Sequence, residues 1–349
     1  MQSRTGEVPA VVAQPPQLDS YRSPHLVRSL LELLITAGPL VLLWLLAWTI
    51  TTHGHLWGLL FTVPAAAFLV RLFMIQHDCG HGSFFSQTGL NTWVGRAIGV
   101  LTLTPYAHWR REHALHHATA GDLDRRGSGD VEVLTVDEFR ALNWIGRAGY
   151  RLFRHPVVMF GLGPAYVFLL RHRLPVGDLS GGWRPWASAM ATNLAILVLA
   201  AGFVWAGGLG PFLMVQLPIT LMAATIGVWL FYVQHQFEGV VWVRSTAWTR
   251  RESALTNCSH YHLPGLLGWF TGNIGVHHVH HLNSRIPFYR LRQVLRDNPE
   301  LDRSRLSVLQ AFRGVRLALW DEAGRKLISF RELKAVRRSS PSASGSLQV

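Results

Sequence analysis

The chain has 349 residues, of which 49% are hydrophobic and only 15% are charged, against roughly 25% charged residues in soluble domains. Its 33 Lys and Arg against 20 Asp and Glu give a net charge of +13, and the high apolar content assigns that charge to a membrane rather than to nucleic acid. The only two cysteines, Cys79 and Cys258, exclude a disulfide framework and a cysteine-rich zinc site.

The N-terminal part of the chain predicts a helical hairpin that crosses a membrane twice. Residues 1–25 are rich in Pro, Ser and Gln and are expected to form a disordered cytoplasmic arm. The run from Leu33 to Val70 contains no charged residue and is long enough for two crossings of about 20 residues each. A turn is expected at residues 51–55, which places the helices at about 33–50 and 56–76.

A second hairpin is predicted between Pro185 and Phe237, a run that also lacks charge and is broken at residues 207–211. Both hairpin turns lack Lys and Arg, so the positive-inside rule places both termini in the cytoplasm. Two shorter apolar stretches, 100–106 and 156–170, are expected not to cross the membrane, and the second is expected to lie in the interface or to dip into the membrane and return. The expected fold is therefore all-α and integral to a membrane, with four transmembrane helices, interfacial helices and a cytoplasmic helical cap.

Histidines are concentrated in three short motifs: HDCGH at 77–81, HALHH at 113–117 and HHVHH at 277–281. Within each motif, spacings of i, i+4 or i, i+3, i+4 place the rings on one stripe of a helix. The number of preceding crossings puts all three motifs on one side of the membrane, together with His235 at the end of the fourth predicted helix. Nine ligands are too many for one metal ion and suit two. The candidate metal ligands are His77, His81, His113, His116, His117, His235, His277, His280 and His281.

Imidazole is compatible with zinc, copper, iron and nickel, so the ligand type alone does not name the metal. Carboxylate-bridged di-iron bundles use Glu-x-x-His pairs, which this sequence lacks, so a nitrogen-rich dinuclear site remains. Asp78, Glu112 and Glu238 lie beside the motifs and are expected to accept hydrogen bonds from ligand rings. The histidines that fall off the repeated stripe are not counted among the ligands: His108, His260, His262 and His278 near the motifs, and His25, His53, His55, His155 and His172 elsewhere.

The three motifs, in this order around two helical hairpins, resemble the histidine boxes of integral-membrane fatty acid desaturases. The resemblance extends from about Leu33 to Tyr289, and HDCGHGSFF, FYVQHQFEG and GNIGVHHVHHLNSRIP are most similar to omega-6 (delta-12) acyl-lipid desaturases and their bacterial relatives. It implies a non-haem site with two iron ions, held by the nine histidines, that uses O2 and two electrons to form a cis double bond in an acyl chain. In some family members a water held by an Asn completes one iron, and Asn273 is the substitute expected here.

The electrons are expected to come from a separate carrier, such as ferredoxin or a cytochrome b5-like protein, because the sequence has no dinucleotide-binding glycine motif and no haem-binding segment. An Arg-rich cytoplasmic surface would attract an acidic carrier. The substrate is expected to be an acyl chain of a membrane lipid or an acyl thioester, held in a narrow apolar tunnel. Aromatic residues near the motifs are the candidates for its wall: Phe84, Phe85, Trp109, Trp229, Phe231, Tyr232, Phe237 and Trp269.

The predicted organisation is a membrane domain at 26–292 that carries the histidine boxes, a cytoplasmic helical segment at 293–338 and a disordered tail at 339–349. Leu317, Leu319 and Trp320 are the apolar anchors of the helical segment. Abundant Arg with little Lys points to a bacterial inner membrane as the location.

Two alternatives keep a metal site. A membrane hydroxylase or a carotenoid ketolase or hydroxylase has a comparable histidine arrangement but forms an oxygenated product. A metal transporter or membrane haem carrier would place its histidines along a path inside the bilayer, whereas here they gather where the helices leave it.

Overall fold

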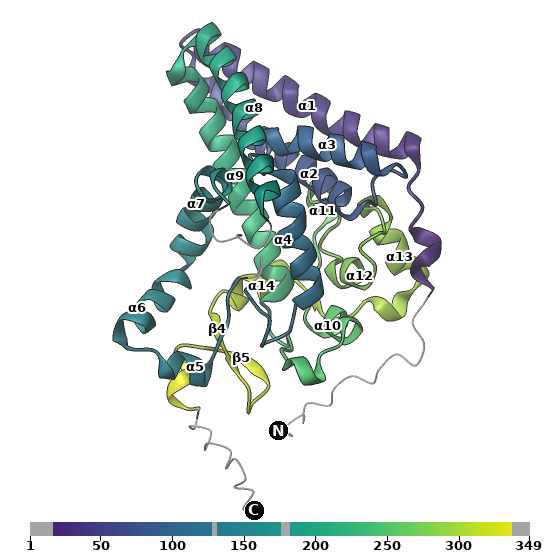
Figure 1. The fold of residues 1–349 in the computed structure, drawn as a ribbon, viewed down its shortest axis with the longest axis vertical. Helices are drawn as coiled ribbons and strands as arrows, with labels where there is room; N and C mark the ends of the chain where they lie inside the picture. The colour runs from purple at the N-terminus through teal and green to yellow at the C-terminus, as the bar shows by residue number, and fades with distance from the viewer. Residues whose placement is uncertain (1–16, 128–130, 176–181, 337–349) are drawn as a thin grey trace, which may run out of the picture.

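The structure is a computed structural model that describes residues 17–127, 131–175 and 182–336. Most of the described chain is helical, and four segments are long and apolar enough to cross a membrane. They lie in the upper half of Figure 1 as two hairpins, α1 with α2 and α8 with α9, so the predicted all-α membrane fold is confirmed. The segments are α1 (Leu26–Thr52), residues Leu56–His81, which include α2 (Thr62–His81), α8 (Trp183–Gly207) and α9 (Leu209–His235).

Helix α1 begins at Leu26, earlier than predicted. Its first turns contain Arg28 and Glu32, which a search for uncharged residues leaves out. Glu32 is buried because it is paired with Arg28, at 2.6 Å, and with Arg71 of α2. His25 caps the helix by accepting a hydrogen bond from the Arg28 amide at 3.3 Å. The charge of Glu32, which placed the predicted start of the helix too late, is thus neutralised by two arginines.

Helix α2 joins the two hairpins, because it packs against α1, α9 and α3 (Thr88–Leu101). Its buried Ala65 and Ala66 are the kind of small residue that lets neighbouring membrane helices approach closely. Helix α8 differs, since only 11% of its most apolar window is buried inside the protein. Its exposed apolar surface is therefore suited to contact with lipid.

Beside α1 and α2, α3 leads into α4 (Tyr106–Thr119), which runs down toward the cap (Figure 1). The short apolar stretch 100–106 is the turn between them and, as predicted, not a crossing helix. The Tyr106 ring lies against Gly95, where a β-carbon would come within 2.3 Å of it. The Tyr106 hydroxyl donates a hydrogen bond to the Cys79 carbonyl oxygen at 2.8 Å. These contacts hold α3 and α4 against the end of α2.

Residues 144–173 contain the stretch that was expected to lie in the interface. Two helical parts of this segment are bent by 61° at a short break. Together they are long and apolar enough for one broken span or a re-entrant loop, so the interfacial placement of 156–170 stays a prediction. The parts are α6 (Trp144–Phe153), a π-helical turn (Val158–Leu162), α7 (Gly163–Leu169) and a 3₁₀ turn (Arg171–Arg173).

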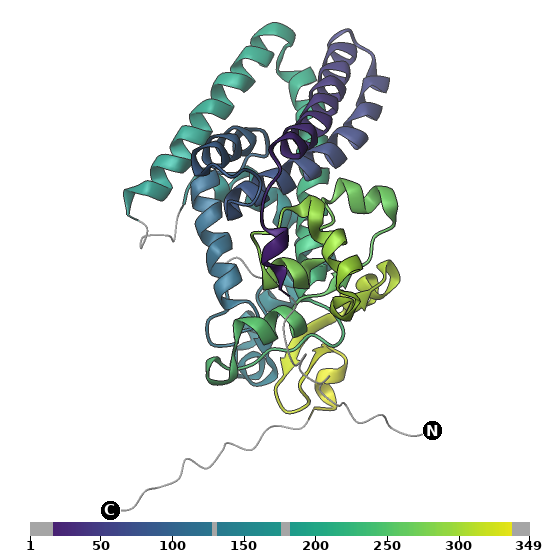
Figure 2. The ribbon, with the colours of Figure 1, turned by 90° about the vertical axis from the view of Figure 1, so that its right-hand side faces the viewer.

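The rest of the described chain forms a cap below the long helices, visible from two sides in Figures 1 and 2. Its short helices are α5 (Val136–Ala141), α10 (Arg250–Thr256), α11 (Gly265–Phe270), α12 (His277–Leu282), α13 (Leu291–Asp297) and α14 (Val308–Gly314). Strand β4 (Leu317–Asp321) pairs in parallel with β1 (Leu134–Thr135) and antiparallel with β5 (Lys326–Ser329), and β2 (His260–Tyr261) pairs in parallel with β3 (Arg305–Leu306).

The C-terminal segment differs from the prediction of helix and loop at 293–338, because it contains the β4–β5 hairpin. The predicted anchors Leu319 and Trp320 are indeed buried, at 0% and 1% exposure, but on a strand. A hairpin signal was present in the sequence, since two short apolar runs flank a turn with Gly324. Arg325 completes that turn with a φ of 49°.

Part of the N-terminal arm is docked rather than disordered. The Tyr21 hydroxyl donates a hydrogen bond to Asp297 Oδ2 at 2.8 Å, and the His25 amide donates to the Tyr289 hydroxyl at 3.0 Å. Residues 17–25 are thereby tied to α13 and the turn before it. Residues 1–16 and the predicted tail at 339–349 lie outside the described residues.

Candidate metal centre

The candidate histidines come from four helices that meet at one end of the membrane-spanning bundle. His77 and His81 occupy the last turns of α2, His235 ends α9, and α4 and α12 carry three histidines each. The structure gathers all nine of them into two adjacent groups. Because α2 and α9 both end at this cluster, the three motifs converge as the count of crossings predicted.

The loop before α12 needs glycine at two positions to bring the third motif to the others. Gly272 has a φ of 58°, a conformation that other residues rarely adopt. Gly275 lies against the Tyr261 carbonyl oxygen, where a β-carbon would be 2.2 Å away. The Tyr261 amide donates to the Gly275 carbonyl oxygen at 2.8 Å. A side chain at position 275 would therefore push this loop, and His277 with it, away from the cluster.

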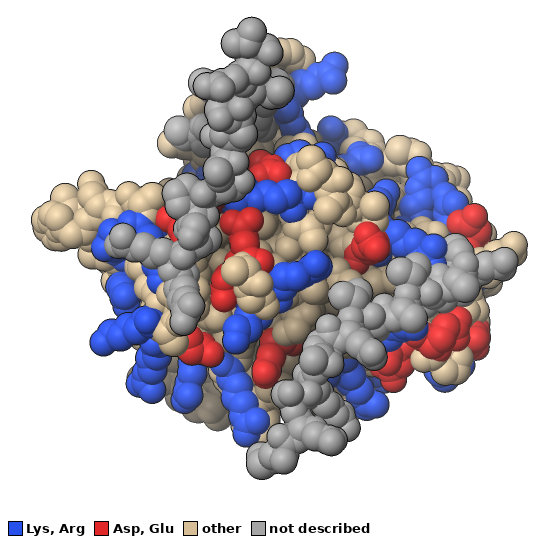
Figure 3. All heavy atoms as spheres, turned by 90° about the horizontal axis from the view of Figure 1, so that it is seen from below, with Lys and Arg blue, Asp and Glu red and all other residues tan. Residues whose placement is uncertain are grey.

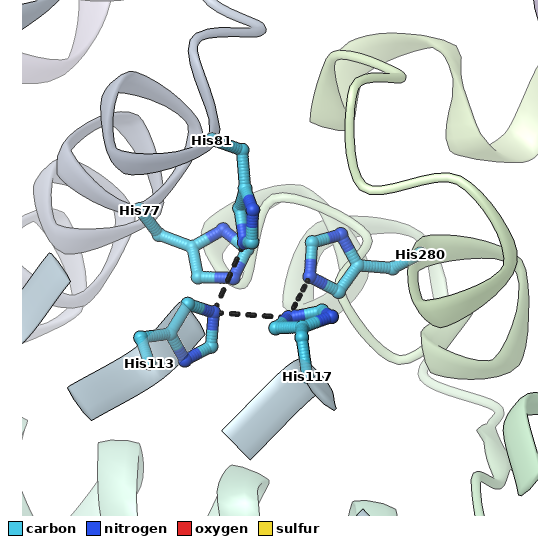
Figure 4. Close-up of side chains that lie close together, drawn as sticks. All are labelled: His77, His81, His113, His117 and His280. Carbon is cyan, nitrogen blue, oxygen red and sulfur yellow. Dashed lines mark hydrogen bonds between the residues drawn. The ribbon is translucent and has the colours of Figure 1, made fainter. Parts of the chain in front are cut away.

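The first group contains five histidines from α2, α4 and α12, and Figure 4 shows their rings turned toward a common space. One nitrogen of each ring lies within 4.8 Å of the others. The Nε2 atom of His113 is 3.0 Å from that of His81 and 3.1 Å from that of His117. The members are His77, His81, His113, His117 and His280.

The second group lies beside the first and contains four buried histidines, again with one nitrogen of each within 4.8 Å of the others. The Nε2 atoms of His235 and His277 are 2.9 Å apart. Consecutive residues divide between the groups, so His117 belongs to the first and His116 to the second. The rings of His117 and His281 stack across the boundary at 4.0 Å. The members are His116, His235, His277 and His281.

The geometry of both groups fits metal ions. Two nitrogens bound at right angles, each about 2.1 Å from a metal, are about 3.0 Å apart, and the close Nε2 pairs are separated by 2.9 to 3.1 Å. Among the described residues, the buried Nε2 of His281 has no hydrogen-bond partner. A buried polar atom without a partner is unfavourable, and a metal ion would satisfy it.

Burial keeps the ligand rings in the form that binds metal. Transfer out of water disfavours a charged imidazolium, and neighbouring histidines add to this effect. The pKa values of five rings outside the membrane-spanning segments are consequently well below their ordinary value. Neutral imidazole is the metal-binding form. These rings are His113, His117, His277, His280 and His281.

Two buried polar side chains contact ligand rings. Asp78 Oδ1 lies 3.4 Å from His77 Nδ1, and its Oδ2 accepts a hydrogen bond from the Phe288 amide at 2.7 Å. Asn257 is fully buried, and both its carbonyl oxygen and its Oδ1 lie 3.2 Å from His235 Nδ1. Because these oxygens only accept, Nδ1 of His235 donates and Nε2 is left to face the cluster. Asp78 was predicted for such a role; Asn257 was not, because no local spacing connects it to His235.

The other three predicted supporting residues lie elsewhere. Glu112 is paired with Arg171 at 3.0 Å, Glu238 is exposed after the end of α9, and Asn273 lines a separate cavity of about 330 Å³ together with Arg292. In the described part of the chain, no hydrogen bond joins these three side chains to a ring of either group.

The histidines near the motifs but off their stripes are outside both groups. His278 Nε2 donates to the Leu301 carbonyl oxygen at 2.6 Å, and His260 Nδ1 lies 2.6 Å from Asp302 Oδ1. The ring of His108 lies 3.7 Å from Glu112, and His262 is exposed. The helical stripe therefore separated the clustered histidines from their neighbours correctly.

A cavity of about 380 Å³ adjoins both histidine groups. His77 and His113 of the first group and His116 and His277 of the second line it, and most of its remaining wall is apolar. Of the predicted aromatic wall, only Trp109 and Phe231 line this cavity. The others lie away from it: Phe84, Phe85, Tyr232 and Phe237 in the core, Trp229 against Phe160 and Phe312, and Trp269 against Arg71.

Residues 153–172 supply a wall that the sequence analysis missed. Met159, Val167 and Phe168 of this segment line the cavity opposite residues of α2 and α9, and so do the polar Arg171 and His172 at its end. The apolar run at 156–170 was visible in the sequence, but only its contact with α9 turns it into a cavity wall.

The fold and the site define a multi-pass membrane protein with a histidine cluster beside an apolar cavity. Residues 54–311, which include all nine clustered histidines, match the family model for fatty acid desaturase. The chain therefore belongs to the fatty acid desaturase family, a family of oxidoreductases, as the histidine boxes predicted.

Curated relatives agree with this assignment. The chain is 41% identical over 326 residues to a fatty acid desaturase of Bacillus subtilis, a match that covers 93% of this chain and 92% of that protein. It is 27% identical over 238 residues to the sn-1 acyl-lipid omega-3 desaturase (ferredoxin) of Synechocystis sp., covering 64% of this chain and 62% of that protein. The omega-3 fatty acid desaturase, endoplasmic reticulum, of Vigna radiata is 29% identical over 237 residues, covering 63% of this chain and 59% of that protein.

Proposed function

We propose that this chain is an acyl-lipid desaturase that forms a cis double bond in an acyl chain of a membrane lipid. The observation that carries the proposal is the contact between both histidine groups and one largely apolar cavity. An apolar wall suits a hydrocarbon chain, and histidines at its edge would bring bound metal next to a methylene group.

The nine histidines would hold two iron ions, four or five ligands to each. When bound, the iron pair supplies the oxidising power that removes two hydrogen atoms from an unactivated acyl chain. In the overall reaction these two hydrogen atoms, two electrons and two protons convert O2 into two molecules of water. The proposal of iron is supported by the family membership and by the all-nitrogen ligand sets.

The protein's own residues would position the chain and exclude water. The Trp109 ring stacks on His113 at 4.8 Å, with 12° between the planes, and the Phe231 ring lies 5.0 Å from that of His116. Each aromatic ring thus covers a histidine of a different group, and both line the cavity. They would hold an acyl chain against the two groups and keep solvent from the reacting carbon atoms.

A separate carrier, such as ferredoxin or a cytochrome b5-like protein, would deliver the electrons at the cytoplasmic face of a bacterial inner membrane. Support comes from the word ferredoxin in the name of the Synechocystis relative. The face of the cap seen from below carries many Lys and Arg side chains with Asp and Glu among them (Figure 3). Arg125 and Arg126 are paired with Asp122 and Glu138, so attraction of an acidic carrier would depend on other arginines.

The histidine-box sequences favour the omega-6 (delta-12) position for the new double bond. Two of the curated relatives named above are omega-3 desaturases. The position of the double bond is therefore the measurement that decides between these types.

Expression in a bacterial host that lacks polyunsaturated lipids tests the proposal. Mass spectrometry of the extracted lipids should locate a new cis double bond, and His116→Ala should abolish it while the protein still reaches the membrane. An oxygenated product would instead identify a hydroxylase or ketolase. Metal analysis of the purified protein should find two irons per chain, and zinc or haem would contradict the proposed site.

A further inference from the structure

The cavity beside the histidines has one polar border, made by Glu112, Arg171 and His172. Arg171 Nη2 donates a hydrogen bond to Glu112 Oε1 at 3.0 Å. This pair is open to solvent, with 50% of the Arg171 side chain and 26% of the Glu112 side chain exposed. His172 is buried, and its Nδ1 has no hydrogen-bond partner among the described residues. A buried nitrogen of this kind is unfavourable against hydrocarbon, so this border suits a polar group.

The polar border lies beside the first half of α8. The turn Arg171–Arg173 is fastened to α8 by two hydrogen bonds between Arg173 and Asn193, of 2.8 and 2.7 Å. Glu112 belongs to α4, which leads away from the ends of the long helices toward the cap (Figures 1 and 2). Half of the Arg171 side chain is exposed, and a long Arg side chain beside a membrane helix can extend its charged end to the headgroup region.

We propose that Arg171 binds the phosphate group at the polar end of the substrate, and that Glu112 holds the Arg171 side chain at the mouth of the cavity until the substrate arrives. The proposal rests on the proposed desaturase function, because it takes the cavity to hold the acyl chain of the same molecule. A phosphate ester is present both in a phospholipid headgroup and in the carrier of an acyl thioester, so either source provides the recognised group.

The chemistry of the Arg171–Glu112 pair supports an exchange of partners. A guanidinium has five N–H donors in a planar fork that matches phosphate oxygens, and the exposed half of Arg171 leaves donors accessible. An ion pair that is partly exposed to solvent is weak, so a phosphate can replace the Glu112 carboxylate without a large loss. The acyl chain would then extend from this mouth along the apolar wall toward the histidines.

Binding to the purified, metal-loaded full chain tests the subsite without turnover. Native mass spectrometry would measure the affinity for dipalmitoyl phosphatidylglycerol, for palmitoyl-CoA and for an uncharged galactolipid with the same chains. Arg171→Gln should weaken binding of the phosphate-containing probes about 10-fold or more, the expected loss of one charge-assisted hydrogen bond, and leave the galactolipid unchanged. Arg96→Gln is the matched control, because Arg96 is an exposed arginine of α3 that lies over Trp93 outside the cavity.

Glu112→Gln separates a binding role from a structural one. If Glu112 competes with phosphate for Arg171, this variant should bind the phosphate-containing probes more tightly, by about 2- to 3-fold. If Arg171→Gln weakens the binding of only one phosphate-containing probe, phosphatidylglycerol or palmitoyl-CoA, the result supports the subsite and identifies which molecule provides the phosphate.

Two results would overturn the subsite: equal weakening of phospholipid and galactolipid by Arg171→Gln, or weakening by Glu112→Gln to the same extent as by Arg171→Gln. Both would mean that the pair only holds the fold together. Normal double-bond formation in cells together with Arg171-independent binding would contradict the subsite alone. The absence of any new double bond with the unaltered chain would contradict the proposed function.

Discussion

The Nε2 atom of His280 lies 3.1 Å from the Nε2 atom of His117, although 163 residues separate the two in the chain. His117 is on α4 and His280 on α12, and the whole α8–α9 hairpin lies between these helices in the sequence. The contact therefore exists only because α9 returns the chain to the level at which α2 ended. Membrane topology, more than local sequence, closes the site.

His280→Ala should remove a ligand from the first group, whereas His278→Ala should not. Both residues are buried on α12, but His278 points away and donates to the Leu301 carbonyl oxygen. Iron content should fall from two per chain to about one or less in His280→Ala, since each metal would depend on its full ligand set. His278→Ala should keep both irons and lose about 1–3 kcal/mol of stability. Metal analysis and thermal unfolding of both variants make the comparison, and equal iron loss in the two would remove His280 from the ligand set.

Asn257→Ala should weaken metal binding in the second group. The Asn257 side chain provides one of two oxygens at His235 Nδ1, and loss of such a partner typically lowers metal affinity 10- to 100-fold. A loss of about tenfold is expected because the backbone oxygen remains. Competition with a chelator measures it. Asn298→Ala is the control, because Asn298 follows α13, donates to the Val294 carbonyl oxygen and belongs to neither histidine group. An unchanged affinity in Asn257→Ala would show that the backbone oxygen alone orients the ring.

The histidines were predictable from sequence because their spacing is a local helical property. Positions i, i+3 and i+4 share a helix face wherever the helix is placed. The uncharged runs gave the number of membrane crossings that precede each motif. Residues that meet a ligand ring from a distant part of the chain carry no such signal. Asn257 reaches His235 through the turn after α10, and residues 153–172 reach the cavity through packing on α9.

In the fold, too, features set by local sequence were predictable and features set by distant contacts were not. The two hairpins followed from hydrophobic length alone, because a membrane imposes it. The start of α1 did not, since Glu32 needed partners on another helix, Arg71 among them, to be buried. The β4–β5 hairpin differs from the predicted helix because the apolar residues around Leu319 can anchor either a helix or a strand, and only the turn at Gly324 distinguishes the two.

Acidification should destabilise the metal-free protein and release bound metal. Burial holds the pKa values of five clustered histidines below their ordinary value of 6.5, so these rings take up protons less readily in the folded protein than in the unfolded chain. Their contribution is fully present above about pH 6.5 and is lost as pH falls below it, by about 1.4 kcal/mol per pH unit for each ring. The thermal midpoint of chelator-treated protein in detergent should fall between pH 7.5 and pH 5.5. A midpoint that changes only below about pH 4.5 would assign the effect to carboxylates instead.

Gly227→Leu should shorten the acyl chain that the protein accepts. Gly227 lies on α9 and lines the cavity, and a β-carbon at this position meets no atom within 4 Å. A leucine should therefore enter the cavity without straining the helix, and it also favours helix formation. Because even one methylene can be worth 10-fold or more in a hydrophobic pocket, the ratio of long-chain to short-chain product should fall by about tenfold. Gly202→Leu is the matched control, since Gly202 lies on α8, has the same free space and is exposed outside the cavity. Lipid analysis of cells that express each variant gives the product ratio. Equal ratios in both variants, with normal iron content, would mean that the acyl chain is held somewhere other than this cavity.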